Sequence, residues 1–208
     1  MQTNWAEENL QTIRTLMERS AVYRRALAPI AIFAGIMGVA GALVGYFFHL
    51  DTGREFCGFW LGTAFVVVIG ALLIARRQAF KAGEMFWSPP TRRVAQALLP
   101  PLVVGMVVGM LFWRSKGSGF NFILPFTWAL FYGCALHSAG FFISRGVKWL
   151  GWGYILSTFG IIFCLSIASA YNLILDLNPH FLMGFFFGAL HLLYGAYLYL
   201  TEKGKNAA

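Results

Sequence analysis

The chain has 208 residues, of which 59% are hydrophobic and 12% are charged. Soluble domains carry about 25% charged residues, so a soluble fold is not expected. The net charge of +8 comes from basic residues in short segments between apolar stretches, which is typical of membrane orientation signals and does not indicate a nucleic-acid partner.

Residues 1–26 are predicted to form an amphipathic cytoplasmic helix. Asn4 is a suitable N-cap with Glu7 three residues later, and apolar side chains recur at helical spacing. The basic residues of this segment are Arg14, Arg19, Arg24 and Arg25. We expect them to bind anionic lipid headgroups, at about 1 kcal/mol each near the surface, or a protein partner.

Six windows that contain no Asp, Glu, Lys or Arg predict six transmembrane helices in one domain, residues 27–200. About 20 residues in a helix cross the ~30 Å hydrocarbon core, and only a helix can do so as a single segment. The predicted spans are 27–48, 56–75, 94–113, 122–143, 149–171 and 181–200. The predicted fold class is therefore all-α, a polytopic membrane helix bundle, with residues 201–208 as a cytoplasmic tail.

Thirteen of the 16 Lys and Arg residues lie before the first span, in the second and fourth loops, or after the last span. An excess of Lys and Arg marks the cytoplasmic side, so both termini are predicted to be cytoplasmic. The second loop contributes Arg76, Arg77, Arg92 and Arg93 to this basic face. Pro89 and Pro90 predict a turn just before the third span.

Glycines at intervals of three or four residues predict close helix packing in the first and third spans. These glycines are Gly35, Gly38, Gly41, Gly45, Gly105 and Gly109. We expect contacts within one chain, and contacts between copies in a homo-oligomer stay open as an alternative.

The inventory of reactive groups is small. The absence of charged residues from the spans removes the usual ion-binding and proton-relay groups of pumps. The motifs of P-loop, zinc-protease and serine-hydrolase enzymes are also missing. Cys57, Cys134 and Cys164 lack metal-site spacing and are interpreted as small apolar residues. No cofactor or metal is predicted, and enzymatic activity is not expected, although it stays open.

The polar candidates lie in the second half of the chain. His191 shares a helical face with two glycines and a tyrosine of the sixth span. The predicted pocket comprises Trp128, Tyr132, Gly188, His191, Tyr194 and Gly195. His191 is interpreted either as a hydrogen-bonding group between helices or as part of a binding site for a small neutral solute.

Two chemical alternatives involve His191. A b-type haem held by His137 and His191 is suggested by their shared Ala-Leu-His contexts, although the two residues differ in predicted depth by about 6 Å. The Ala-Leu-His-x-x-x-Gly of residues 189–195 resembles intramembrane rhomboid proteases. That family has a G-x-S-G in its fourth span, whereas here Ser138 is followed by Ala139 and Gly140.

Three stretches resemble an uncharacterised family of bacterial six-span integral membrane proteins: residues 8–29, Phe-Trp-Ser-Pro-Pro-Thr-Arg-Arg at 86–93, and Phe-Gly-Ala-Leu-His at 187–191. The resemblance implies a multi-pass protein of the bacterial inner membrane and no known activity. The main hypothesis is a non-enzymatic accessory or sensor module that presents a basic cytoplasmic face to a cytoplasmic or membrane protein partner. The alternatives are a carrier or pore for a small neutral or apolar solute, and a haem-binding or catalytic membrane protein.

Overall fold

The computed structural model describes residues 27–83, 85–114, 121–171, 173 and 177–205, which contain helices and turns but no strand. The predicted amphipathic helix of residues 1–26 lies outside the described residues. The helices are a first helix Leu27–Phe47, α2 Gly53–Lys81, α3 Pro89–Trp113, α4 Ile123–Ala139, α5 Arg145–Ala170, and a last helix made of α6 Pro179–Met183, the π-helical η1 Gly184–Ala189 and α7 Leu190–Lys205.

Five of these helices are long and apolar enough to cross a membrane. The exception is α4, whose 17 residues rise about 26 Å. The prediction of an all-α chain built on six apolar helices is thus confirmed for the described part of the chain.

Helices α2 and α3 are longer than the spans predicted for them. Helix α2 continues past residue 75 to Lys81, and α3 begins at Pro89 instead of residue 94. Ser88 is the N-cap of α3, and the two prolines occupy the first turn, where the N–H that proline lacks has no helical partner in any case. The predicted turn at Pro89 and Pro90 is therefore wrong, because this pair begins the helix.

Helix α4 is shorter than its predicted span, which extended to residue 143. It ends at Ala139, and a tight turn then leads to α5. A Cβ atom on Gly140 would lie only 2.6 Å from the Lys148 backbone nitrogen, so the two helices approach closely here. The tight turn after α4 and the missing side chain of Gly140 allow this close approach.

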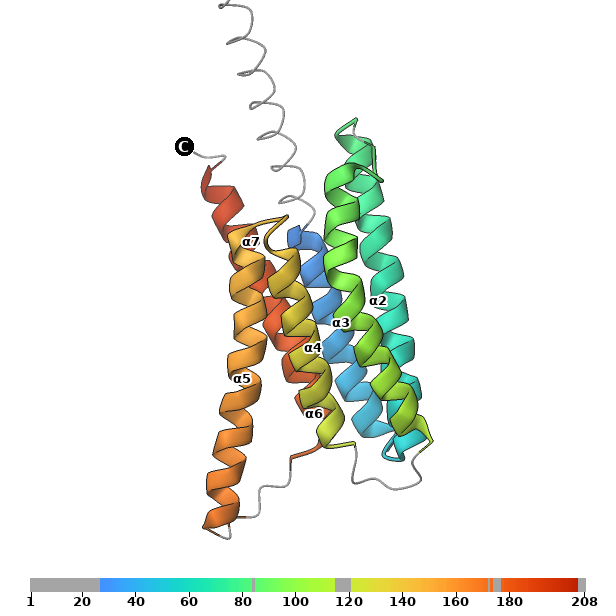
Figure 1. The fold of residues 1–208 in the computed structure, drawn as a ribbon, viewed down its shortest axis with the longest axis vertical. Helices are drawn as coiled ribbons and strands as arrows, with labels where there is room; N and C mark the ends of the chain where they lie inside the picture. Colours follow the sequence, from blue (N-terminus) through green and yellow to red (C-terminus); the bar gives the residue numbers. More distant parts are fainter. Residues whose placement is uncertain (1–26, 84, 115–120, 172, 174–176, 206–208) are drawn as a thin grey trace, which may run out of the picture.

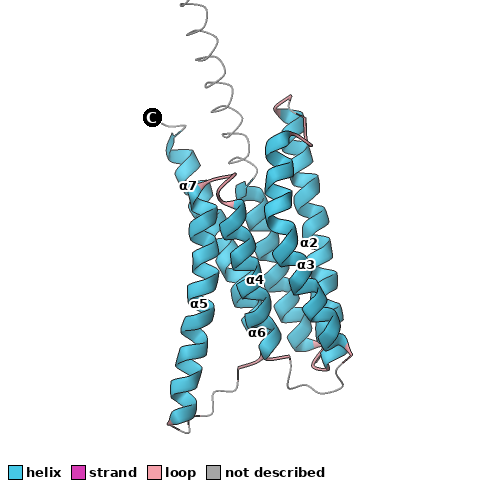
Figure 2. Ribbon diagram, viewed as in Figure 1, coloured by secondary structure: helices cyan, strands magenta, loops and turns pink. Residues whose placement is uncertain are grey.

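Helices α2 to α5 are arranged as successive antiparallel neighbours (Figures 1 and 2), and the first helix packs against the last. A Cβ atom on Gly38 would lie 2.3 Å from the Phe187 carbonyl oxygen, and one on Gly188 would lie 2.9 Å from the Val39 nitrogen. The two backbones are therefore in direct contact. The glycine stripe of the first helix is used within the chain.

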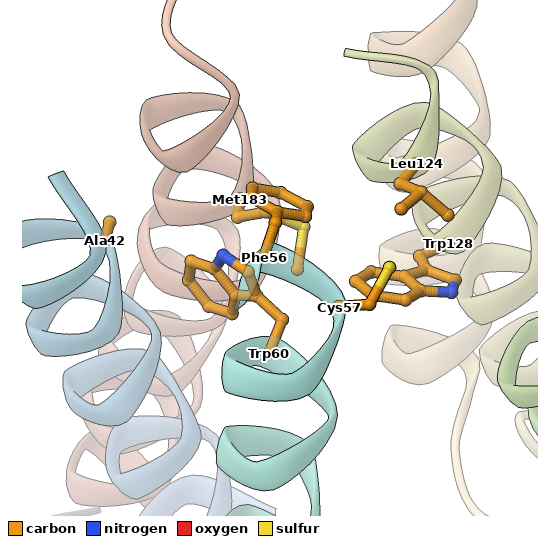
Figure 3. Close-up of a cluster of buried hydrophobic side chains, with 7 residues drawn as sticks. All are labelled: Ala42, Phe56, Cys57, Trp60, Leu124, Trp128 and Met183. Carbon is orange, nitrogen blue, oxygen red and sulfur yellow. The ribbon is translucent and has the colours of Figure 1, made fainter. Parts of the chain in front are cut away.

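Two clusters of buried side chains form the core. The cluster in Figure 3 joins the first helix, α2, α4 and α6 through Ala42, Phe56, Cys57, Trp60, Leu124, Trp128 and Met183. The other joins α4, α5 and the last helix through Phe126, Ala129, Tyr154, Leu182 and Phe186. Outside these clusters, α2, α3 and α5 expose many large apolar side chains, including Phe65, Leu111 and Phe163. Such a surface is suited to hydrocarbon and not to water.

Candidate functional site

Three helices meet at the imidazole of His191. The residue lies on α7, and its side chain is 6% exposed. The Tyr132 hydroxyl of α4 lies 2.8 Å from Nε2, and the Tyr154 hydroxyl of α5 lies 2.8 Å from Nδ1. Both ring nitrogens therefore have hydrogen-bond partners inside the bundle.

The direction of these hydrogen bonds follows from the number of available protons. Tyr154 donates its only hydroxyl hydrogen to the Phe186 carbonyl oxygen at 2.5 Å. His191 Nδ1 must then carry a hydrogen and donate it to the Tyr154 oxygen. Nε2 of the neutral ring is left as an acceptor for the Tyr132 hydroxyl. The result is one chain of hydrogen bonds from Tyr132 through His191 and Tyr154 to the Phe186 carbonyl.

The π-helical segment η1 explains why that carbonyl is available. The Leu190 N–H donates to the Phe185 carbonyl, five residues back, and so bypasses the Phe186 carbonyl that it would reach in an α-helix. The Tyr154 hydroxyl supplies a donor to the bypassed oxygen. The hydroxyl thus replaces the missing backbone donor. Without it, the buried carbonyl would have no partner and would destabilise the fold by about 1–3 kcal/mol.

The six residues of the predicted pocket have different neighbours in the structure. Tyr132 and His191 are in contact, but Trp128 donates to the Gly105 carbonyl at 2.8 Å and packs against α3. The Tyr194 hydroxyl lies 3.0 Å from the position of a Cβ atom on Gly146, at the start of α5.

The two glycines of the predicted pocket make room for the first helix. A Cβ atom on Gly188 would lie 2.8 Å from a methyl carbon of Val39. The same atom on Gly195 would lie 2.7 Å from the Ile32 side chain. The space beside these two glycines is thus filled by the first helix.

The two histidines of the haem alternative have different surroundings. Both of its nitrogens are hydrogen-bonded to tyrosines, so an iron atom would have to displace one hydroxyl. His137 packs edge-on against Phe141 and Trp152, and its Nδ1 atom is buried without a hydrogen-bond partner among the described residues. In this arrangement, haem ligation by His191 would require a tyrosine hydroxyl to move away.

A second buried histidine was not singled out from the sequence. His180, on α6, has a fully buried side chain and stacks on Trp60 of α2 at 6.2 Å between ring centroids. The Trp60 indole N–H donates to its Nδ1 at 3.1 Å, and its Nε2 lies 3.3 Å from the Leu50 carbonyl oxygen. Since an indole N–H can only donate, Nδ1 is the acceptor, and the hydrogen on Nε2 is donated to Leu50.

Polar groups surround this second histidine at the end of the bundle. Asp51 places one carboxylate oxygen 4.0 Å from His180 Nε2 and the other 4.0 Å from Nδ1 of the exposed His49. The buried Asn121 amide donates to the Asp51 backbone carbonyl. His49 has a φ of 50°, a left-handed conformation that is uncommon outside glycine, and it ends the first helix.

Sequence reasoning missed Tyr154 and His180 for different reasons. Tyr154 lies on one face of α5 with Gly151 and Thr158, a spacing that was available as a signal. His180 follows Asn178 and Pro179, which are typical of a helix start and would have placed the histidine inside the helix.

Charge is distributed unequally between the two ends of the bundle (Figure 1). At the end where α2 finishes and α5 begins, the basic residues of α2, α3 and α5 are Arg76, Arg77, Lys81, Arg92, Arg93, Arg145 and Lys148. The described charges at the opposite end are Arg54 and Arg114 with Asp51 and Glu55. The first set is referred to below as the basic end.

The sequence matches no protein-family model, no curated protein and no solved structure.

Proposed function

We propose that the chain is an integral protein of the bacterial inner membrane in which all six apolar helices cross the bilayer and both termini face the cytoplasm. In this proposal the protein is a non-enzymatic accessory or sensor module. Its basic end binds an acidic surface of a protein partner, with anionic lipid headgroups as neighbours.

The observation that carries this proposal is the unequal charge of the two ends. The described basic residues gather where α2 meets α3 and where α4 meets α5, and these junctions share one end with the finish of α7. Positive charge beside a span marks the cytoplasmic side and attracts anionic surfaces. The α2–α3 junction also exposes Met85 and Trp87, which supplies apolar contact area for a partner.

Helix α4 is the shortest of the proposed spans. Its rise of about 26 Å is a few ångströms less than the ~30 Å hydrocarbon core. Local thinning of the bilayer accommodates such a difference at a fraction of a kcal/mol per ångström. The length of α4 is therefore compatible with six spans.

The interior supports a structural role for His191 in preference to a solute pathway. Its two nitrogens bind Tyr132 and Tyr154, and the adjacent glycines pack against Val39 and Ile32. A carrier would have to separate these contacts to admit a solute. Binding of a partner at the basic end needs no such rearrangement.

The test of the partner site is site-specific photo-cross-linking in living cells from a probe at Met85, which is 80% exposed. We expect a cross-linked protein that disappears in Arg92→Gln/Arg93→Gln, because these two charges lie at the same junction. The matched control, Arg54→Gln/Arg114→Gln, removes two charges from the opposite end and should leave the cross-link unchanged. A cross-link that survives the first pair, or is lost equally in the control, would contradict the proposal.

A further inference from the structure

The buried His180 ring joins three segments that are distant in the sequence. It belongs to the first turn of the last helix, accepts a hydrogen bond from Trp60 of α2, and donates to the Leu50 carbonyl in the connection between the first helix and α2. Phe56 and Phe59 of α2 also contact the ring, with centroids at 4.9 Å and 6.3 Å. The imidazole is thus a tie between the last helix and the first two.

The hydrogen bond from Trp60 exists only while Nδ1 is unprotonated, whereas the bond from Nε2 to the Leu50 carbonyl does not depend on it. Nδ1 can accept the Trp60 indole N–H because it carries a lone pair. A proton on Nδ1 would place two N–H groups opposite each other across 3.1 Å, and the indole has no acceptor atom with which to adapt. Protonation therefore replaces an attraction with a repulsion.

A partner for the charged ring lies close by. The Asp51 carboxylate is half-exposed and lies 4.0 Å from Nε2, too far for a hydrogen bond in the present arrangement. Its other oxygen faces His49, whose side chain is 82% exposed. Solvent protons thus reach the carboxylate that lies beside the buried ring.

The first helix and α2 place uncharged groups against the His180 ring. The first helix contributes Gly45, and α2 contributes Phe56, Phe59 and Trp60. The nearby Glu55 carboxylate is engaged with Thr52 in the N-cap of α2, where the hydroxyl donates to it at 2.7 Å. Just before α4, the neutral Asn121 amide donates to the Asp51 backbone carbonyl.

The ring cannot change partners without moving the helix that carries it. A Cβ atom on Gly45 would lie 2.2 Å from His180 Nδ1, which shows that the imidazole lies directly against the first helix. The ring is enclosed on its other sides by the aromatic side chains of α2. Reaching Asp51 therefore requires the start of the last helix to shift away from Trp60.

We propose that His180 is a proton-operated latch: when neutral it holds the last helix to Trp60 and Leu50, and when protonated it leaves Trp60 and pairs with Asp51. This role rests on the proposed sensor function, and it identifies the proton as the stimulus that the sensor detects. Acidification on the Asp51 side opens the latch, and a rise in pH closes it. The movement passes to the rest of the last helix, which continues to the basic end.

The experiment follows the Trp60 indole N–H in purified full-length protein in lipid nanodiscs by NMR with ¹⁵N-labelled tryptophan. The Trp60 signal is assigned by its absence in Trp60→Phe. Between about pH 8 and about pH 5, where histidine changes charge, we expect this signal to lose its hydrogen-bonded position. The other indole signals serve as internal controls for the fold.

Two variants separate the latch from other titrating groups. His180→Asn keeps an acceptor oxygen near the Nδ1 position and cannot gain a charge, so its Trp60 signal should not change with pH. Asp51→Asn removes the partner of the charged ring and should move the transition to lower pH. Because Asp51 is half-exposed, this variant remains informative even if His180→Asn does not fold.

A Trp60 signal that stays constant over this pH range in the wild-type protein would overturn the proposal. So would an unchanged transition in His180→Asn, or one unaffected by Asp51→Asn. A transition abolished by His49→Asn alone would also overturn it, because the exposed histidine would then be the titrating group. The measurement needs no partner, so its failure is distinguishable from failure of the cross-linking test at the basic end.

Discussion

At the scale of single residues, the Tyr154 hydroxyl makes more hydrogen bonds than the Tyr132 hydroxyl does. It serves two buried groups, His191 Nδ1 and the Phe186 carbonyl, whereas the Tyr132 hydroxyl serves only His191 Nε2. Tyr154→Phe should therefore lower the free energy of unfolding by about 1–3 kcal/mol, and Tyr132→Phe by less than about 1 kcal/mol. Unfolding of the purified proteins in mixed detergent micelles measures both values.

Because phenylalanine keeps the ring in both variants, the comparison isolates the hydroxyl group. His191→Phe should fall between them, since it leaves both tyrosine hydroxyls without their histidine partner but retains the bond from Tyr154 to Phe186. Equal losses in the two tyrosine variants would show that the bypassed carbonyl does not depend on Tyr154.

At the scale of elements, the contact between the first and last helices depends on glycine. Gly38→Ala would place a methyl group 2.3 Å from the Phe187 carbonyl oxygen, and a helix backbone cannot yield as a flexible side chain can. We expect the free energy of unfolding to fall by about 1–3 kcal/mol, as for other overpacked sites. The same unfolding measurement in detergent micelles tests this.

The matched control is Gly62→Ala on α2, where a Cβ atom would meet no other atom within 4 Å. Alanine is the better helix former by up to about 1 kcal/mol, so this variant should be as stable as the wild-type protein or more stable. A Gly38→Ala protein that unfolds like Gly62→Ala would contradict the packing of the two helices.

At the scale of the whole molecule, the unequal charge of the two ends predicts the orientation in the membrane. Reporter fusions at Ala208 and in the α2–α3 connection at Met85 should report the cytoplasmic side, because the basic end faces inward in the proposed topology. A fusion at Asp176 should report the outer side. A C-terminus on the outer side would contradict the proposed orientation.

The sequence by itself determined the number of helices and their approximate places, because length and apolar composition are local properties of a segment. The predicted second span ended at residue 75, just before Arg76, whereas backbone hydrogen bonding continues through Arg76 and Arg77 to Lys81. A charged side chain limits the part of a helix that can lie in the hydrocarbon core of the membrane, but it does not end the helix. The helix ends were therefore less well predicted than the helices themselves.

Only the tertiary structure decided which polar groups meet. His191 was identified from its chemistry, and its contact with Tyr132 was anticipated in part. The contact of Gly188 and Gly195 with the first helix was not predicted. The partners of His180 could not be inferred in this way, since Trp60 lies 120 residues away in the chain. A buried polar group takes whatever partner the packing of distant helices brings within hydrogen-bond distance, and that packing depends on the shapes of all the contacting faces together.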